Sequence, residues 1–268
     1  MKKELFTYGY VELIESWGSD ERIIESARMS TNKGFLGWGP LPSDVCKRCG
    51  YTEELAGNYC EDSDGLTIHN FTKSGDEKLL EYLYRNNHLT PFEMCGATFE
   101  ISAPIFVFRE WHRHRTQSYN EMSARYIQMP NVHYVPTIER IMNSGQDVKN
   151  KQGSKKLEIN EQDAFRLQLS IKATQDRIYE QYEYWLSVGI SKEVARINTP
   201  VSRFSKMRAS ANLRNWLHFL SLRNDATGNP PQGGHAQFEI REYARIVQEF
   251  LTEKFPRSLG LFELERTT

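Results

Sequence analysis

The stretch that decides the fold and chemistry of this chain is RHRTQSYNEMSARY, residues 113–126. Within thirteen residues it carries four basic side chains, those of Arg113, His114, Arg115 and Arg125. Ser118 and Glu121 have the spacing of a capping box, which predicts that a helix begins here. Helix N-termini and arginines both bind anions. The stretch therefore predicts a phosphate or carboxylate site, the alternative being a solvated basic loop.

The residues before this stretch favour a site that is held against a core. Apolar side chains alternate with polar or small ones at Cys95, Ala97, Phe99 and Ile101. This period of two predicts a half-buried strand. A helix is predicted to restart near Pro104, because proline fits the first helical turn. The basic stretch follows this helix directly, so we expect the protein core to support it.

The remaining pattern predicts a helix-rich α+β fold with a small sheet. A further strand is predicted over Tyr10–Ser16. Helices are predicted over Asp20–Arg28, from the capping box Ser74–Glu77 to before Pro91, and over Asn160–Val188, Ser191–Arg196, Ala209–Leu222 and His235–Phe255. No internal repeat or linker interrupts them, so we expect one intertwined domain over residues 1–268.

Composition restricts the possible partners. The 268 residues are 39% hydrophobic and 26% charged, which is typical of a globular protein. No apolar run approaches the roughly 18 residues of a membrane span. The N-terminal MKKELFTYGY lacks the apolar core of a secretory signal, so we expect a cytoplasmic protein without a membrane partner. The net charge of −1 disfavours nucleic-acid polymers as partners but permits a local arginine cluster.

Six ordered segments resemble one protein family. Arg113-His114-Arg115, followed by seven residues and Ser123, matches the signature of the flavin-dependent thymidylate synthases (ThyX). The flanks APIFVFREWHRHR and SYNEMSARY agree with it, as do SARMS (26–30), HLTPFE (88–93), EVARINTP (193–200), the Asn212-Leu213-Arg214 helix and HAQFEI (235–240). The similarity covers nearly the whole chain outside two insertions.

This resemblance implies a fold, a reaction and an assembly. The implied fold is ThyX-like, with a small antiparallel sheet flanked by helices. The implied reaction converts dUMP to dTMP, with 5,10-methylenetetrahydrofolate as the carbon donor. FAD is the implied cofactor, and NADPH is the co-substrate that reduces it. The implied assembly is a homotetramer with active sites shared between subunits.

The resemblance also assigns residues to ligands. The positions that match FAD contacts are Thr90, Arg113, His114, Arg115, Glu121, Asn212, Leu213, Arg214 and His218. The positions that match dUMP contacts are Glu110, Trp111, His112, Arg113, Glu121, Met122, Ser123, Ala124, Arg125, Arg196 and Arg223. His88 matches a position near the flavin, and a histidine that caps helix carbonyls is an equally good interpretation.

Arg223 matches the arginine that stabilises negative charge on the pyrimidine. A fixed cation there favours the ionised ring, so that C5 attacks without a covalent enzyme nucleophile. Ser123 lacks an evident base partner and resembles a substrate-positioning residue. Cys95 is predicted to lie on the buried face of a strand, where cysteines behave as small hydrophobes. A covalent cysteine mechanism is therefore disfavoured.

Two insertions depart from the family pattern, at about residues 31–68 and 226–234. The first is predicted to be a long loop. Phe35, Leu36 and Trp38 in this loop offer an alternative to metal binding, which is to pack over a ligand or a neighbouring subunit. Four potential zinc ligands lie in or beside it, namely Cys46, Cys49, Cys60 and His69. The loose spacing leaves free thiols on a loop as the alternative. The second insertion is predicted to form a protruding loop between Arg223 and His235.

Two other classes of protein compete with an enzyme. One is a nucleotide- or RNA-binding module, which the near-zero charge and the absence of RNA-binding motifs disfavour. The other is an inactive oligomeric scaffold, which is disfavoured because every matched catalytic position is filled.

Overall fold

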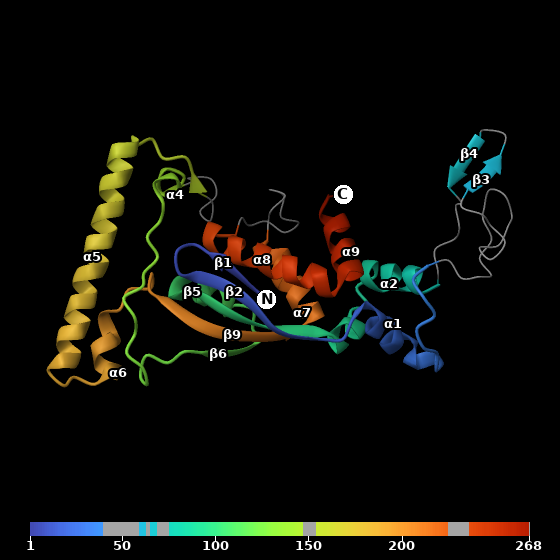
Figure 1. The fold of residues 1–268 in the computed structure, drawn as a ribbon, viewed down its shortest axis with the longest axis horizontal. Helices are drawn as coiled ribbons and strands as arrows, with labels where there is room; N and C mark the ends of the chain where they lie inside the picture. Colours follow the sequence, from blue (N-terminus) through green and yellow to red (C-terminus); the bar gives the residue numbers. More distant parts are fainter. Residues whose placement is uncertain (40–58, 63–64, 69–74, 147–153, 225–235, 268) are drawn as a thin grey trace.

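An antiparallel five-stranded sheet organises the chain, with strand order β1-β2-β5-β9-β6 (Figure 1). Its strands are β1 (Lys2–Leu5), β2 (Gly9–Trp17), β5 (Gly96–Pro104), β9 (Phe204–Asn212) and β6 (Ser118–Glu121). The computed structural model describes residues 1–39, 59–62, 65–68, 75–146, 154–224 and 236–267. Two small hairpins lie outside the main sheet, formed by β3 (Tyr59–Asp62) with β4 (Gly65–Ile68) and β7 (Gly145–Gln146) with β8 (Ser154–Lys155).

Helices pack on the sheet and extend beyond its ends. The longer ones are α1 (Asp20–Arg28), α2 (Gly75–Arg85), α5 (Glu161–Ser187), α7 (Leu213–Arg223), α8 (Phe238–Lys254) and α9 (Pro256–Thr267). The shorter ones are η1 (Met29–Thr31), η2 (Thr90–Met94), α3 (Ile105–Trp111), α4 (Ile138–Met142), α6 (Lys192–Ala195) and η3 (Arg196–Asn198). No helix within the described residues is long and apolar enough to cross a membrane. The α+β prediction is confirmed.

The core lies between one face of the sheet and helices α7 and α8 (Figure 1). The predicted alternation in β5 is confirmed, because Ala97, Phe99 and Ile101 are all fully buried. The Phe99 ring packs edge-on against Trp216 of α7, with centroids 5.0 Å apart. The Tyr243 hydroxyl of α8 donates to the Ser102 carbonyl oxygen at 2.8 Å. Aromatic packing thus fixes both helices on the sheet.

Strand β9 corrects the predicted helix over Ala209–Leu222. Residues 209–212 belong to a strand that pairs with β5 from Gly96↔Asn212 to Pro104↔Phe204, and the helix begins only at Leu213. Alanine and arginine in this segment favour a helix locally. Pairing on both sides of the strand overrides that preference. The Asn212 side chain then accepts the backbone N–H of Asn215 at 3.0 Å and caps α7.

Strand β6 corrects the helix predicted to begin at Ser118. Residues 118–121 pair with the other edge of β9, in register from Ser118↔Ser210 to Glu121↔Met207. The Tyr119 hydroxyl donates to the carbonyl oxygens of Trp111 (3.0 Å) and His114 (2.8 Å), which fixes the segment beside α3. A capping box is a local signal, and here sheet pairing outweighs it.

Helix α5 has the predicted length, but several of its apolar side chains are exposed. Asn160 caps its start by accepting the Asp163 N–H at 2.8 Å, and Gly189 follows its end with a φ of +89°. Tyr182 is buried, whereas Phe165 and Leu169 are 45% and 49% exposed. The helix stands apart from the sheet at one end of the molecule (Figure 1). Phe165, Leu167, Leu169 and Tyr184 therefore lie on the surface of this chain.

Asp20 joins the two ends of the sequence. It is 3% exposed at the start of α1, and it accepts hydrogen bonds at the start of α9. The donors are the Arg257 N–H (2.8 Å), the Ser258 N–H (3.2 Å) and the Ser258 hydroxyl (2.5 Å). The carboxylate thus satisfies backbone groups that a helix N-terminus leaves without partners.

Replacing Asp20 by alanine should lower the free energy of unfolding by about 1–3 kcal/mol, because the buried donors lose their acceptor. Urea denaturation at neutral pH measures the change. Glu25→Ala in the same helix is the matched control. It removes a carboxylate from an exposed ion pair with Arg22 and should cost less than about 0.5 kcal/mol. Equal losses in both variants would contradict the assigned role of Asp20.

Candidate active site

Arg223 lies at the centre of a polar cluster between α7 and α3. Its Nε donates to His114 Nε2 at 3.0 Å, and one terminal nitrogen donates to the Glu110 carbonyl oxygen at 3.3 Å. The other terminal nitrogen lies 3.5 Å from a Glu110 carboxylate oxygen. The Arg223 side chain is 19% exposed, so most of it is enclosed. The guanidinium is therefore held along its edges by two residues of the 110–115 segment.

This contact defines the protonation state of His114. An arginine can only donate, so His114 Nε2 must accept and carry no proton. Burial, followed by the charges of Arg223 and the neighbouring His218, lowers the pKa of His114 to about 4. His114 is 5% exposed, and its ring also packs edge-on against Phe219. A neutral imidazole thus orients the Arg223 guanidinium.

Glu110 occupies the other side of this cluster. Burial raises the pKa of its carboxyl group, and the opposing charge of Arg223 only partly compensates. Its second carboxylate oxygen, Oε1, is buried without a hydrogen-bond partner. Burial likewise lowers the pKa of Arg223, although an arginine stays charged at any physiological pH. The cluster thus holds a fixed cation beside a carboxyl group that can gain or lose a proton.

Several other predicted cofactor residues lie near the start of α7, whereas Glu121 pairs with Met207 at the far end of β6. Arg214 donates to Glu93 of η2 at 2.6 Å, which ties this helix to the segment containing Thr90. The side-chain amide of Asn215 donates to the Thr116 carbonyl oxygen at 3.3 Å. This contact holds residues 113–117, the basic loop, beside α7. Exposed side chains in this region are those of Thr90, Arg113, Arg115, Arg214 and His218. The structure therefore brings the basic loop, η2 and α7 together.

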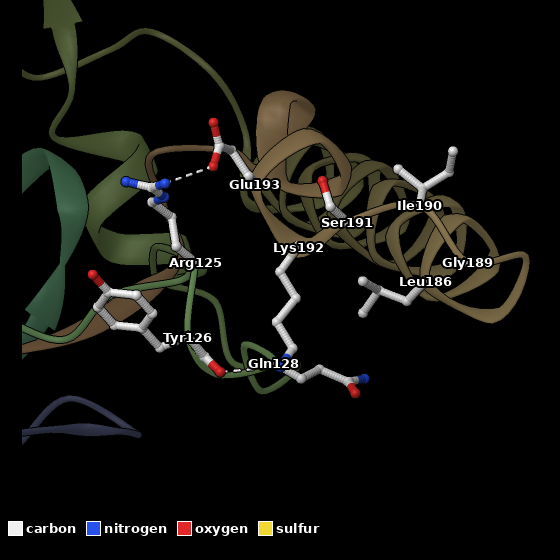
Figure 2. A pocket seen from close by; sticks show the side chains of 9 residues that line it. All are labelled: Arg125, Tyr126, Gln128, Leu186, Gly189, Ile190, Ser191, Lys192 and Glu193. Carbon is white, nitrogen blue, oxygen red and sulfur yellow. Dashed lines mark hydrogen bonds and ion pairs between the residues drawn. The ribbon is translucent and has the colours of Figure 1, made fainter.

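A second group of predicted residues lies against α6. Arg125 pairs with Glu193 at 2.8 Å, and Lys192 donates to the Tyr126 carbonyl oxygen at 3.0 Å (Figure 2). These residues line a cavity of about 480 Å³ between the 125–128 segment and the turn after α5. Arg223, His114 and Arg214 do not line it. One chain thus divides the predicted substrate residues between two places.

Several predicted site residues turn their side chains into the protein. Trp111 and Leu213 are fully buried, and Ala124 is 7% exposed. The Trp111 indole donates to Gln117 Oε1 at 3.0 Å, and the His112 ring nitrogen Nε2 lies 3.1 Å from the sulfur of Met207. The Ser123 hydroxyl accepts the Arg125 N–H at 3.3 Å. These side chains support the shape of the loop rather than present reactive groups.

Sequence reasoning missed three residues that hold the site. Tyr119 and Gln117 hold the segment from Trp111 to Gln117 in place, through hydrogen bonds with His114 and Trp111. Glu93 pairs with Arg214. Glu93 lies inside the HLTPFE segment, so its position beside a basic helix start was a usable signal. The roles of Tyr119 and Gln117 depend on contacts with Trp111 and could not be seen in the sequence pattern.

The cysteines give no sign of a nucleophile among the described residues. Cys95 is fully buried, and its thiol donates to the Ser19 carbonyl oxygen at 3.3 Å. Burial raises its pKa to about 11, so the thiol stays protonated. Cys46, Cys49 and His69 lie outside the described residues, and only the backbone of Cys60 is described, in β3. Within the described part, no three acidic, histidine or cysteine side chains form a metal-binding group.

The start of the first insertion packs on its own chain. The Trp38 indole donates to Glu21 Oε1 at 2.5 Å, and the Arg257 guanidinium lies 4.5 Å from its ring centroid. The Phe35 ring is 4.9 Å from Trp38. Trp38 thus contacts α1 and α9 of its own chain, and packing of these aromatics over a ligand or another subunit stays a prediction. The predicted loop over residues 31–68 also contains the β3–β4 hairpin.

Comparison with known proteins identifies the family. The model of the family described as thymidylate synthase complementing protein matches residues 12–257. A flavin-dependent thymidylate synthase of Ehrlichia ruminantium (strain Gardel) is 33% identical over 254 residues, covering 95% of this chain and 70% of the relative. One from Treponema denticola is 32% identical over 255 residues, covering 95% and 79%. The chain therefore belongs to the flavin-dependent thymidylate synthases, a family of methyltransferases.

A solved structure agrees with this assignment. The chain is similar to the UMP/dUMP methylase PolB from Streptomyces cacaoi bound with 5-Br UMP, with a TM-score of 0.73 and 28% identity. The match covers 96% of this chain and 94% of PolB. PolB bound with 5-Br dUMP gives a TM-score of 0.72 at 29% identity. The described sheet and helices thus form a fold shared with a pyrimidine nucleotide methylase.

Lowering the pH should reduce the free energy of unfolding, because His114 is neutral in the folded protein. Its folded pKa of about 4 lies below the usual value, so between these values the unfolded state binds more protons. Stability should therefore fall as the pH is lowered from about 6.5 toward 4, by about 2–3 kcal/mol from this residue alone. His114→Gln does not titrate and keeps an oxygen that can accept from Arg223. Urea denaturation across this range should give a smaller loss for the variant; parallel pH profiles would contradict the assignment.

Proposed function

We propose that this chain methylates dUMP to dTMP. The reaction takes a one-carbon unit from 5,10-methylenetetrahydrofolate and reducing equivalents from NADPH, leaving tetrahydrofolate and NADP⁺. FAD, when bound, carries the electrons between NADPH and the transferred carbon. Family membership supports the reaction class. The naming of PolB as a UMP/dUMP methylase supports a uridine monophosphate as the substrate.

The observation that carries this proposal is the fixed position of Arg223. A cation held by His114 and Glu110 does not have to reorganise when negative charge develops on a ligand. Placed beside a pyrimidine, it favours the ring ionised at N3 and so makes C5 electron-rich. C5 can then attack the carbon donor without a thiolate. The buried, protonated thiol of Cys95 is consistent with this route.

The residues around α7 have the chemistry that FAD requires. The pyrophosphate of FAD is anionic, and Arg113, Arg115 and Arg214 are exposed guanidinium groups beside the start of α7. Asn212 and His218 supply further polar groups there, and Thr90 lies across the Arg214–Glu93 pair. We assign this region to the cofactor and add Glu121, the last residue of β6, as a further cofactor contact. Glu110 and Arg223 face the pyrimidine.

The separation of Arg125 and Arg196 from Arg223 supports a shared active site. Arg125 lies beside α6, and Arg196 begins η3 directly after it. Exposed apolar side chains lie at the same end of the folded molecule, along α5 and beyond it. They are Phe165, Leu169, Val188, Val194 and Ile197. Such a surface is typical of an interface. We propose a homotetramer in which one subunit supplies Arg125 and Arg196, and another supplies Arg223.

We further propose that residues 1–268 form one catalytic domain with insertions at about 31–68 and 226–234. The β5–β9 pairing and the Asp20 contacts join distant parts of the sequence, which supports a single unit. Localisation in the cytoplasm is proposed because the substrate and the reduced cofactors are metabolites of that compartment.

The purified chain should bind FAD and convert dUMP to dTMP when NADPH and methylenetetrahydrofolate are present. Arg223→Ala should retain FAD and lose methylation by about 10²–10³-fold or more, because a preorganised cation is removed. Flavin absorbance measures the first property, and the yield of dTMP measures the second. Running UMP in parallel determines which of the two nucleotides is methylated.

Arg208→Ala is the matched control. Arg208 lies on β9, pairs with Glu100 at 3.1 Å and is exposed, so its loss should leave the rate within about twofold. A colourless protein that binds no added FAD and leaves dUMP unaltered would refute the function. Normal turnover by Arg223→Ala would refute only the role of Arg223.

Mixed oligomers test the shared site. Arg196→Ala and Arg223→Ala should each be inactive alone, because every site lacks one arginine. Co-expressed chains carrying different tags should regain about a quarter of the wild-type rate, since one site in four combines two intact halves. Isolation through both tags and a dTMP assay measure this. An inactive hybrid would show that both arginines serve a site within one subunit.

A further inference from the structure

The last turn of α7, which carries Arg223, lies outside the protein core. The core holds α7 as far as Leu220, which is fully buried. Leu222 is 38% exposed, and the helix ends at Arg223 itself. Helix ends fray, because their last carbonyl groups have no partner within the helix. A catalytic cation at this position therefore needs contacts from outside α7 to hold its backbone.

Asn224, the residue directly after Arg223, receives such contacts. It is 3% exposed, and its backbone N–H donates to the Leu220 carbonyl oxygen at 2.9 Å, which closes the last turn of α7. Its side-chain amide donates to Gln248 Oε1 of α8 at 2.6 Å. Its carbonyl oxygen accepts a hydrogen bond from the guanidinium of Arg266 in α9. Two other helices thus fix the backbone next to Arg223.

The side chain of Asn224 can take only one orientation in this arrangement. Gln248 Nε2 donates to Glu263 Oε1 of α9 at 2.7 Å. An ionised carboxylate only accepts hydrogen bonds, so Gln248 must turn its NH2 group toward Glu263 and its oxygen toward Asn224. Asn224 must in turn present its own NH2 group to Gln248. This chain of hydrogen bonds ends on a charged group, which makes it stronger than an isolated neutral pair.

Arg266 places a cation at the C-terminal end of α7. Its guanidinium donates to the carbonyl oxygens of Asn224 and, at 3.5 Å, of Leu220. It also packs over the Phe262 ring, 5.1 Å from the centroid. Basic side chains at a helix C-terminus stabilise it by bonding to its last carbonyl groups. Arg266 and Glu263 lie beyond residue 257, where the match to the family model ends.

We propose that Gln248 and Arg266 are positioning residues for the methylation reaction, which hold the backbone of Asn224 and thereby the last turn of α7 that carries Arg223. The proposal rests on the proposed function of Arg223. The contacts of the candidate active site hold the guanidinium of that arginine, and Gln248 and Arg266 hold the opposite end of the residue. A cation fixed at both ends does not have to reorganise when negative charge develops on the pyrimidine.

Gln248→Met should lower kcat for dUMP methylation by about tenfold or more, because a displacement of about 1 Å is costly at a catalytic group. The KM for dUMP and the amount of bound FAD should stay within about threefold, since the lost interaction acts in the transition state. Glu249→Met is the matched control, because the adjacent Glu249 pairs with Lys3 and Arg245 instead. It should leave kcat within about twofold. A lower Tm with a wild-type kcat in Gln248→Met would overturn the proposal.

Arg266→Met tests the contact from α9 separately, and it serves as the main variant if Gln248→Met does not fold. It should lower kcat in the same way. Arg266→Lys keeps a cation that can donate to helix carbonyl groups and should retain most of the rate. Arg257→Met is the control in the same helix, because Arg257 pairs with Glu77 of α2 at 3.0 Å. Equal kcat values for Arg266→Met and Arg257→Met would overturn the role of Arg266.

A double variant shows whether these residues act through Arg223. Adding Gln248→Met to Arg223→Ala should cause no further loss of methylation, because the group that Gln248 positions is already absent. A further tenfold loss in the double variant would mean that Gln248 acts elsewhere, and it would overturn the proposal.

The pKa of His114 tests the same contacts without an enzymatic assay. Burial and the charge of Arg223 lower it to about 4. If the last turn of α7 loosens, this pKa should rise toward the usual value of about 6.5. NMR titration of histidine-labelled Gln248→Met and Arg266→Met measures it, with His114→Gln to assign the signal. An unchanged pKa in both variants would overturn the proposal. A raised pKa in a chain that makes no dTMP would refute the proposed function and support the hold on Arg223.

Discussion

The pairing of β9 with β5 is the contact on which the rest of the structure depends. The two strands pair from Gly96↔Asn212 to Pro104↔Phe204, and the buried side chains along them form one face of the core. At one end of β9, Asn212 caps α7 and so fixes the direction in which Arg223 points. The other edge of β9 pairs with β6, which follows the basic residues Arg113, His114 and Arg115 in the chain. One strand thus positions both halves of the Arg223–His114 contact.

The sequence was informative where periodicity was strong. The alternation over residues 95–101 predicted β5, and the helical spacing over residues 160–188 predicted α5, because both patterns depend on neighbours in the chain. Strands β9 and β6 were missed, since their local signals favour helices and only pairing with distant residues makes them strands. For the site, the arginines could be named from the resemblance. The contact of His114 with Arg223, 109 residues away, depends on the tertiary fold.

The two arginine environments in this chain differ in how their charge is balanced. Arg223 is held by a histidine that must remain neutral and by a carboxyl group whose second oxygen lacks a partner. Within the part of the chain that the structure describes, the Arg203 guanidinium contacts two aromatic faces and forms no ion pair. The first arrangement holds a cation in a fixed orientation. The second leaves a charge inside the protein that nearby side chains do not neutralise. The composition gives a net charge of −1 but does not say which arginines are buried, so it indicated neither environment.

The carboxylates that pair with the surface arginines have a consequence for selectivity. Arg125 with Glu193 and Arg214 with Glu93 each form an ion pair within the chain. An incoming anion must therefore exchange places with a carboxylate instead of meeting a bare guanidinium. A monovalent anion gains little from such an exchange, because it replaces one charge with another of the same size. A phosphate dianion gains more, so these internal counter-ions favour a dianion over a monovalent anion.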